Sequence, residues 1–151
     1  MEAFVIVLGS LILLGLGLWV GMYISRKDSS YERVKEFHEA FGHPAPPKPA
    51  IIDDGRSKLR IELIREELFE LQEAVIAGDL VAIADALGDL DYVVNGAAIE
   101  YGIDLPSITA EIHRSNMTKL GPGGKPIYRE DGKILKGDSY EPPNLKPVLG
   151  L

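Results

Sequence analysis

The chain has 151 residues, enough for one ordinary domain with short additional segments. Its net charge of −7 argues against general nucleic-acid binding, which requires Lys and Arg to replace counterions on the phosphates. It contains no cysteine, which excludes disulfides, thiolate chemistry and cysteine-ligated zinc. A small phosphorylated ligand stays compatible with this charge, because a bound divalent cation can reverse the local field.

The first predicted element is an apolar run over residues 4–24 that contains no charged residue. At about 1.5 Å per residue it would span roughly 30 Å, the thickness of a bilayer core. Only Glu2 precedes the run, whereas Arg26 and Lys27 follow it, the reverse of the charge order in a signal peptide. We therefore expect residues 1–25 to be a single-pass transmembrane anchor, with the rest of the chain in the cytoplasm. A buried core helix and a cleaved signal are the alternatives.

Residues 26–56 are predicted to form a short helix and a proline-rich linker. The helix, over residues 31–41, has Val34, Phe37 and Phe41 on one face at helical spacing, which is typical of core positions. The four closely spaced prolines that follow exclude a helix and indicate an extended linker or surface loop.

Residues 57–120 are predicted to form a bundle of three helices. The first, over 57–77, has an apolar stripe at helical spacing and ends at Gly78. The second, over 80–100, is apolar on most of its circumference, as expected of a helix at the centre of packing. The third, over 106–116, begins with a proline, which suits a first helical turn.

Residues 121–151 differ in composition from the helices that precede them. The pair Asp131-Gly132 lies between two short apolar runs and predicts a β-hairpin. The tail from Tyr140 contains three prolines and is expected to be an extended arm. The predicted fold class is thus all-α: a helical bundle with one N-terminal transmembrane helix and a short C-terminal hairpin and tail.

Three glutamates of the first long helix lie within about one turn. Glu67 is three residues from Ile64 and four from Leu71, both on the apolar stripe, so its carboxylate should point toward the core. Burying an unpaired carboxylate is costly, so such a group usually has a cationic partner. Because Glu66 and Glu70 lie beside it, the three carboxylates would repel one another unless a cation sits among them.

Asp85 and Asp89 lie four residues apart on the otherwise apolar second helix. Aspartate is unfavourable in a helix interior. Facing the first helix, these two would complete an all-oxygen cage suited to Mg²⁺ or Mn²⁺ rather than to zinc or copper. The alternative is an ion-pair network with arginines, for which the candidates are Arg56, Arg60, Arg65 and Arg114. His38 and His113 have no partner at zinc-ligand spacing and are expected to be ordinary surface or interface residues.

The run from Glu67 to Glu70, followed after fourteen residues by Asp85 to Asp89, resembles the ExxE…ExxD signature of the all-α nucleoside triphosphate pyrophosphohydrolases. That superfamily includes the MazG-like enzymes, and the likeness is greatest to the phosphoribosyl-ATP pyrophosphohydrolase-like type. It covers residues 31–145. Three further stretches share it: FHEAFG at 37–42, HRSNMTKL at 113–120 and DGKILKG at 131–137.

The resemblance implies cleavage of a nucleoside polyphosphate between the α- and β-phosphates, giving a nucleoside monophosphate and pyrophosphate. It implies Mg²⁺, or Mn²⁺, as the cofactor and Glu66 as a further ligand or the general base. One position departs from the signature, because its second glutamate would fall on Ala86, which cannot bind metal. We expect the neighbouring Asp85 to substitute. The implied metal ligands are Glu67, Glu70, Asp85 and Asp89.

The resemblance also implies substrate contacts outside the two acidic helices. Asn116 and Lys119 correspond to phosphate contacts of the family, and Arg114 has the same standing. Without the likeness, Lys119 would be an ordinary cation favoured by a helix C-terminus. Phe37 is a candidate for stacking on a base, although its spacing with Phe41 is more typical of core residues.

Three helices of one chain would leave the apolar second helix uncovered, so a homodimer or homotetramer is expected, as in related proteins. Two alternatives to an enzyme stay open. One is a non-catalytic, membrane-anchored module that binds nucleotide or metal, which the Ala86 departure favours. The other is a purely structural helical bundle, which would leave Asp85 and Asp89 unexplained.

Overall fold

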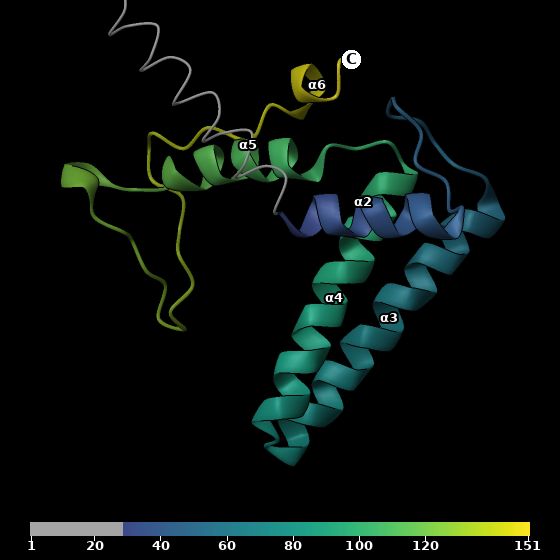
Figure 1. Cartoon of the computed structure of the whole chain (residues 1–151). Coiled ribbons are helices and arrows are strands. Elements are labelled where there is room, and N and C mark those ends of the chain that lie inside the picture. Colours follow the sequence, from purple (N-terminus) through teal and green to yellow (C-terminus); the bar gives the residue numbers. More distant parts are fainter. Residues whose placement is uncertain (1–28) are drawn as a thin grey trace, which may run out of the picture.

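The structure, a computed structural model, describes residues 29–151 and is all-α there (Figure 1). The predicted transmembrane segment lies outside the described residues. Within 29–151, none of the helices combines the length and apolar character needed to cross a membrane. The helices are α2 (Ser30–Phe41), α3 (Asp54–Ala77), α4 (Leu80–Glu100), α5 (Leu105–Met117) and the short α6 (Leu145–Val148), with one 3₁₀ turn at Pro122–Gly124.

Helices α3 and α4 form a long antiparallel hairpin that carries the rest of the described chain (Figure 1). Helix α3 begins three residues before its predicted start, because the Asp53 side chain accepts a hydrogen bond from the Arg56 amide and caps it. Gly78, at φ 68°, ends α3 in the left-handed conformation that glycine adopts without strain. The next residue, Asp79, caps α4 by accepting from the amides of Val81 and Ala82.

Helix α2 packs across α4, and this crossing decides which of its side chains are buried. Val34 and His38, one turn apart, meet α4 and are 1% and 2% exposed. Phe37 and Phe41, for which helical spacing favoured a core position, are instead 37% and 68% exposed. His38, expected to be an ordinary surface or interface residue, is instead buried within the chain, because it lies in the short patch where α2 crosses α4.

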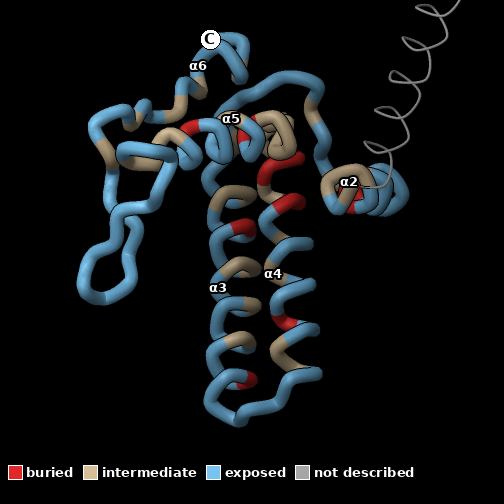
Figure 2. The backbone as a smooth tube through the Cα atoms, turned by 90° about the vertical axis from the view of Figure 1, so that its left-hand side faces the viewer, coloured by how far each residue is buried: buried red, intermediate tan, exposed pale blue. Residues whose placement is uncertain are grey.

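The core lies at the C-terminal end of α4, where α2, α3 and α5 come together (Figure 2). Gly96, Ala98 and Ile99 are buried there. Near the other end of α4, Leu80 and Val81 are 78% and 79% exposed, so α4 is central only over its last turns within one chain. The predicted burial of the whole helix is therefore not reached in a single copy.

At the predicted hairpin, the segment after α5 forms a turn with a single β-bridge and not two paired strands. Tyr128 and Ile134 make one isolated antiparallel bridge, closed by a turn with Gly132 at φ 82°, and residues 29–151 contain no longer strand. The tail lies along α5 and then forms α6, so the expectation of a wholly extended arm is wrong over Leu145–Val148.

Candidate active site

The candidate carboxylates occupy the middle of the α3–α4 hairpin. Glu67 on α3 is half-buried, whereas Asp85 and Asp89 on α4 are exposed. Glu66 and Glu70, on either side of Glu67, are exposed too. The inward position of Glu67 follows from its place between the apolar neighbours of the α3 stripe, which contact α4.

Carboxylates on both helices act on Glu67. The pKa of Glu67 is raised, first by burial and then by the negative charges of Glu70, Asp89, Glu66 and Asp85. Burial and like charges both disfavour the ionised form of a carboxylic acid. The structure therefore brings carboxylates of α3 and α4 into one negative field centred on Glu67, the kind of field that a divalent cation neutralises.

A groove of about 430 Å³ opens beside these carboxylates, toward the turn between α3 and α4. Glu70 and Asp85 line it from opposite helices, and Glu73 adds a third carboxylate. Ala86 also lines the groove and is only 4% exposed, so the position at which the signature predicts a second glutamate holds a methyl group between the helices. Asp85 reaches the groove from its rim.

The donor chemistry of this region fits a hard divalent cation, because every candidate ligand is a carboxylate oxygen. Among residues 29–151, no three His, Asp or Glu side chains are gathered closely enough to hold a metal ion. The ligand set of Glu67, Glu70, Asp85 and Asp89 therefore stays a prediction from the sequence.

The arginines considered as alternative partners for the two aspartates are engaged elsewhere. Arg60 pairs with Glu100 at 2.8 Å, and Arg56 pairs with the same carboxylate. Arg65 pairs with Glu62 on the exposed side of α3. An ion-pair network with these arginines therefore does not account for Asp85 and Asp89.

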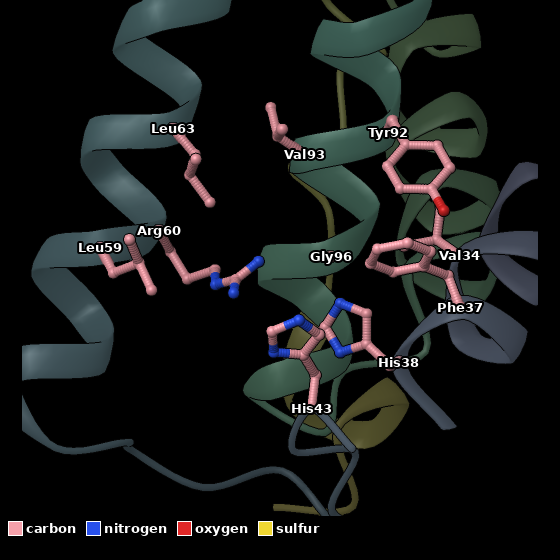
Figure 3. Close-up of a pocket in the computed structure, with 10 residues that line it drawn as sticks. All are labelled: Val34, Phe37, His38, His43, Leu59, Arg60, Leu63, Tyr92, Val93 and Gly96. Atoms are coloured by element: carbon pink, nitrogen blue, oxygen red, sulfur yellow. The ribbon is translucent and has the colours of Figure 1, made fainter. Parts of the chain in front are cut away.

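The predictions from the sequence do not include the burial of three polar residues near the site: His38, Arg60 and Glu100. His38 and Arg60 line a second cavity between α2, α3 and α4 (Figure 3), and Glu100 pairs with Arg60. The spacing of Arg60 does indicate burial, because Arg60 lies four residues before Ile64 on the apolar stripe of α3. Glu100 closes an apolar helix, and its position alone does not distinguish a buried charge from an exposed one.

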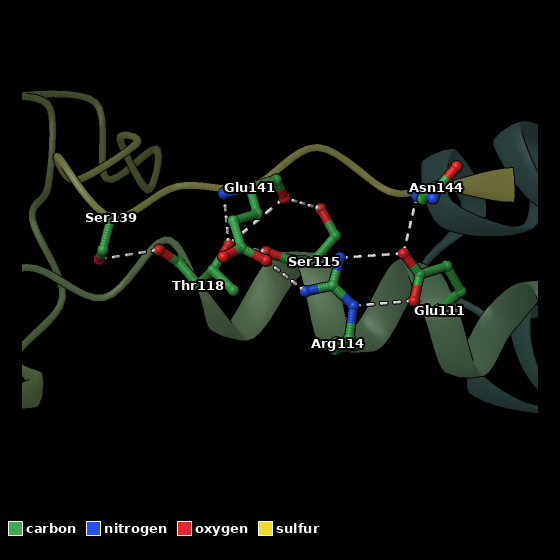
Figure 4. Close-up of polar contacts among 7 residues, drawn as sticks. All are labelled: Glu111, Arg114, Ser115, Thr118, Ser139, Glu141 and Asn144. Carbon is green, nitrogen blue, oxygen red and sulfur yellow. Dashed lines mark hydrogen bonds and ion pairs between the residues drawn. The ribbon is translucent and has the colours of Figure 1, made fainter.

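The predicted phosphate contacts on α5 lie apart from the carboxylates of the same chain. Helix α5 follows the C-terminal end of α4, which is about 16 Å along the helix from Asp89. Arg114 is held by Glu111 and Glu141, each at 2.8 Å (Figure 4). Asn116 is exposed, and Lys119 is half-buried just beyond the end of α5.

Comparison with known proteins assigns the chain to a protein family. The family described as phosphoribosyl-ATP pyrophosphohydrolase matches residues 34–116. The uncharacterised protein L479 of Acanthamoeba polyphaga mimivirus is 35% identical over 124 residues, which are 78% of this chain and 47% of that protein. The chain thus spans about half the length of this curated relative. A solved protein of Exiguobacterium sp. 255-15, assigned by its description to the NTP pyrophosphohydrolases, is 30% identical over 81% of this chain and 92% of its own, with a TM-score of 0.42.

Proposed function

Because the chain belongs to the phosphoribosyl-ATP pyrophosphohydrolase family, we propose that it is a divalent-metal-dependent nucleotide pyrophosphohydrolase. Its substrate is a nucleoside polyphosphate, cut between the α- and β-phosphates to a nucleoside monophosphate and pyrophosphate. The observation that carries the proposal is geometric: Glu70 on α3 and Asp85 on α4 line one groove from opposite helices, beside the half-buried Glu67, whose pKa is raised by burial and by the neighbouring carboxylates. Carboxylates are gathered in this way at sites that bind Mg²⁺ and phosphates.

The five carboxylates divide into two roles in the proposed reaction. Glu67 and Glu70 on α3, with Asp85 and Asp89 on α4, would hold Mg²⁺ or Mn²⁺. When bound, the cation supplies neutralisation of phosphate charge and a lower pKa for a coordinated water. Glu66 is exposed beside these ligands and accepts a proton from the attacking water as general base.

The principal alternative is a module of the same fold that binds nucleotide and metal without turnover. Ala86 supports it, since the position of the family's second glutamate holds a buried methyl group. Metal-dependent release of pyrophosphate separates the two functions, because only the enzyme produces it.

The first test measures pyrophosphate released by the full chain from a panel of nucleoside triphosphates, with Mg²⁺, Mn²⁺ or EDTA. We expect metal-dependent release that falls by about 100-fold or more in Glu67→Gln and Asp89→Asn, because each removes a charged ligand. Glu62→Gln is the matched control, since Glu62 lies on α3 but pairs with Arg65 outside the carboxylate group.

Each contrary result has a defined meaning. Metal-dependent nucleotide binding without pyrophosphate release would replace the enzyme by the binding module. Release that survives both Glu67→Gln and Asp89→Asn would remove the carboxylate group from the mechanism.

A further inference from the structure

Residues 119–137, which we call the basic arm, project from the end of α5 as an irregular hairpin. The arm stands apart from α3 and α4 in both views of the chain (Figure 1 and Figure 2), and every residue from 122 to 136 is exposed. It is closed by the bridge between Tyr128 and Ile134 and by the Arg129 amide, which donates to the Lys133 carbonyl oxygen at 2.8 Å. An isolated two-stranded hairpin is only marginally stable in water. Packing on another surface would therefore stabilise the arm.

The arm combines an apolar face with positive charge. Tyr128 and Ile134 are paired across the bridge, so their side chains share a face, and they are 61% and 49% exposed. Residues 119–137 contain five Lys or Arg against two Asp or Glu, whereas the whole chain contains 16 Lys or Arg against 23 Asp or Glu. No ion pair within residues 29–151 holds Lys125 or Lys133. The arm thus has the opposite charge to the rest of the chain.

The turn end of the α3–α4 hairpin has the complementary surface. Residues 66–100 contain nine Asp or Glu and no Lys or Arg. The groove of about 430 Å³ near this turn has a floor of small apolar side chains, among them the buried Ala74 and Ala86. Its acidic lining includes Glu70, Glu73 and Asp85, and no ion pair holds these three carboxylates in the part of the chain that the structure describes. Opposite charges on two surfaces favour their association.

The arm and the groove do not meet within one chain, because residues 122–136 are exposed along their whole length. A second copy of the chain supplies both surfaces at once. If two copies exchange their arms about a two-fold axis, each arm occupies one groove and the assembly is closed. One pair of chains then satisfies both surfaces.

We propose that the basic arm of one copy docks on the turn end of the α3–α4 groove of a second copy, which docks its own arm in return. Tyr128 and Ile134 cover the apolar floor, and Lys125 and Lys133 lie against the acidic rim at Glu73. The inference goes beyond the proposed function and rests on the two surfaces alone, so it is tested without nucleotide.

Cysteine cross-linking tests the contact directly, because the chain has no cysteine of its own. Full chains carrying Glu73→Cys and Tyr128→Cys, distinguished by two affinity tags, are co-expressed and treated with a short bismaleimide. We expect a covalent dimer that carries both tags. In the control, Thr109→Cys, at an exposed position on α5, replaces Tyr128→Cys and should give no such dimer.

Two outcomes of the cross-linking would overturn the proposal. One is the absence of a dimer with both tags. The other is cross-linking only inside single chains that carry both Glu73→Cys and Tyr128→Cys, which would place the arm on the helices of its own chain.

Charge reversal gives an independent measurement by sedimentation velocity over a dilution series. Lys125→Glu combined with Lys133→Glu should raise the dissociation constant of the assembly about tenfold, because opposite charges become like charges. Adding Glu73→Lys should restore part of the affinity. Lys48→Glu combined with Lys146→Glu makes the same change in net charge at exposed positions outside the arm and should leave the dissociation constant unchanged. Equal weakening by the two pairs, or none by the arm pair, would overturn the docking of the arm.

Discussion

Glu100 shows how much a single charge contributes when it is buried. It is 1% exposed and holds both Arg56 and Arg60, which come from the first two turns of α3. Removing one partner of a buried ion pair leaves the other charge uncompensated, at a cost of about 3–5 kcal/mol. We expect Glu100→Ala to lower the free energy of unfolding by that amount in urea titrations.

Glu62→Ala is the comparison for this prediction. Glu62 pairs with Arg65 on the same helix, but both side chains are more than half exposed. Exposed pairs contribute about 0–1 kcal/mol. Equal effects of the two substitutions would show that Glu100 is not the anchor of α3.

His38 makes stability depend on pH in a defined direction. Its pKa is lowered from 6.5, first by burial and further by Arg60 and His43, while the Pro44 carbonyl and Glu100 oppose the shift. Below about pH 6.5 the unfolded chain therefore takes up a proton before the folded chain does, and stability falls by at most about 1.4 kcal/mol per pH unit. Urea midpoints between pH 7.5 and 5 should fall less steeply in His38→Gln.

The control for this pH dependence is His113→Gln, at an exposed position on α5. If His113→Gln removes the change of the urea midpoint with pH and His38→Gln keeps it, the pH dependence arises from His113 and not from His38.

For single residues, the sequence predicts burial where burial depends on spacing within one helix. The half-buried position of Glu67 follows from its spacing in the sequence, three residues after Ile64 and four before Leu71 on the same helix. The partnership of Arg56 with Glu100 joins residues 44 positions apart, and no local pattern contains it. The burial of His38 is of the same kind, because it depends on where α2 crosses α4.

Among the elements, local caps explain which boundaries could be predicted. The prediction of 80–100 for α4 agrees with Leu80–Glu100, because Gly78 and Asp79 provide a helix stop and a cap in adjacent positions. The sequence predicts the start of α3 three residues too late, since Asp53 follows a proline-rich stretch that shows no helical period. Helix α6 has only four residues, too few to show any periodicity.

The segment 138–144 is held on α5 by hydrogen bonds from side chains (Figure 4). The Glu141 amide donates to Thr118 Oγ1 at 2.8 Å, and the Glu141 carbonyl accepts from Ser115 at 2.7 Å. Thr118→Val removes the acceptor while keeping the shape of the side chain. We expect amide exchange in this segment to become up to about tenfold faster, because one hydrogen bond contributes roughly 0.5–1.5 kcal/mol.

Hydrogen exchange followed by mass spectrometry makes this measurement, with Thr109→Val on the exposed side of α5 as the control. Amides of α3 and α4 should exchange as before in both variants. Faster exchange in α4 as well would mean that the segment supports the whole helical hairpin and not its own contacts alone.

For the whole molecule, the α3–α4 hairpin exposes more apolar surface than a single copy explains. The large side chains that are at least half exposed lie along both helices away from the core; they include Leu68, Phe69, Val75, Ile76, Leu80, Val81 and Leu87. Large exposed apolar side chains gathered along one helical hairpin are typical of an interface. A second copy of the chain, packing its own hairpin alongside, would cover this surface.

Association would also complete the candidate site. Arg114, Asn116 and Lys119 lie on or just beyond α5, away from the carboxylates of their own chain. A second copy packed alongside would bring them toward these carboxylates. We therefore expect light scattering to show that the full chain is a homodimer or homotetramer.

Val81→Glu should dissociate this assembly, because the new carboxylate would be buried in the interface. Phe41→Glu, an exposed change outside this hairpin, is the control. If Val81→Glu leaves both the mass and the melting temperature unchanged, the hairpin is not the interface; if it yields folded monomers that release pyrophosphate at the original rate, the site is complete within one chain.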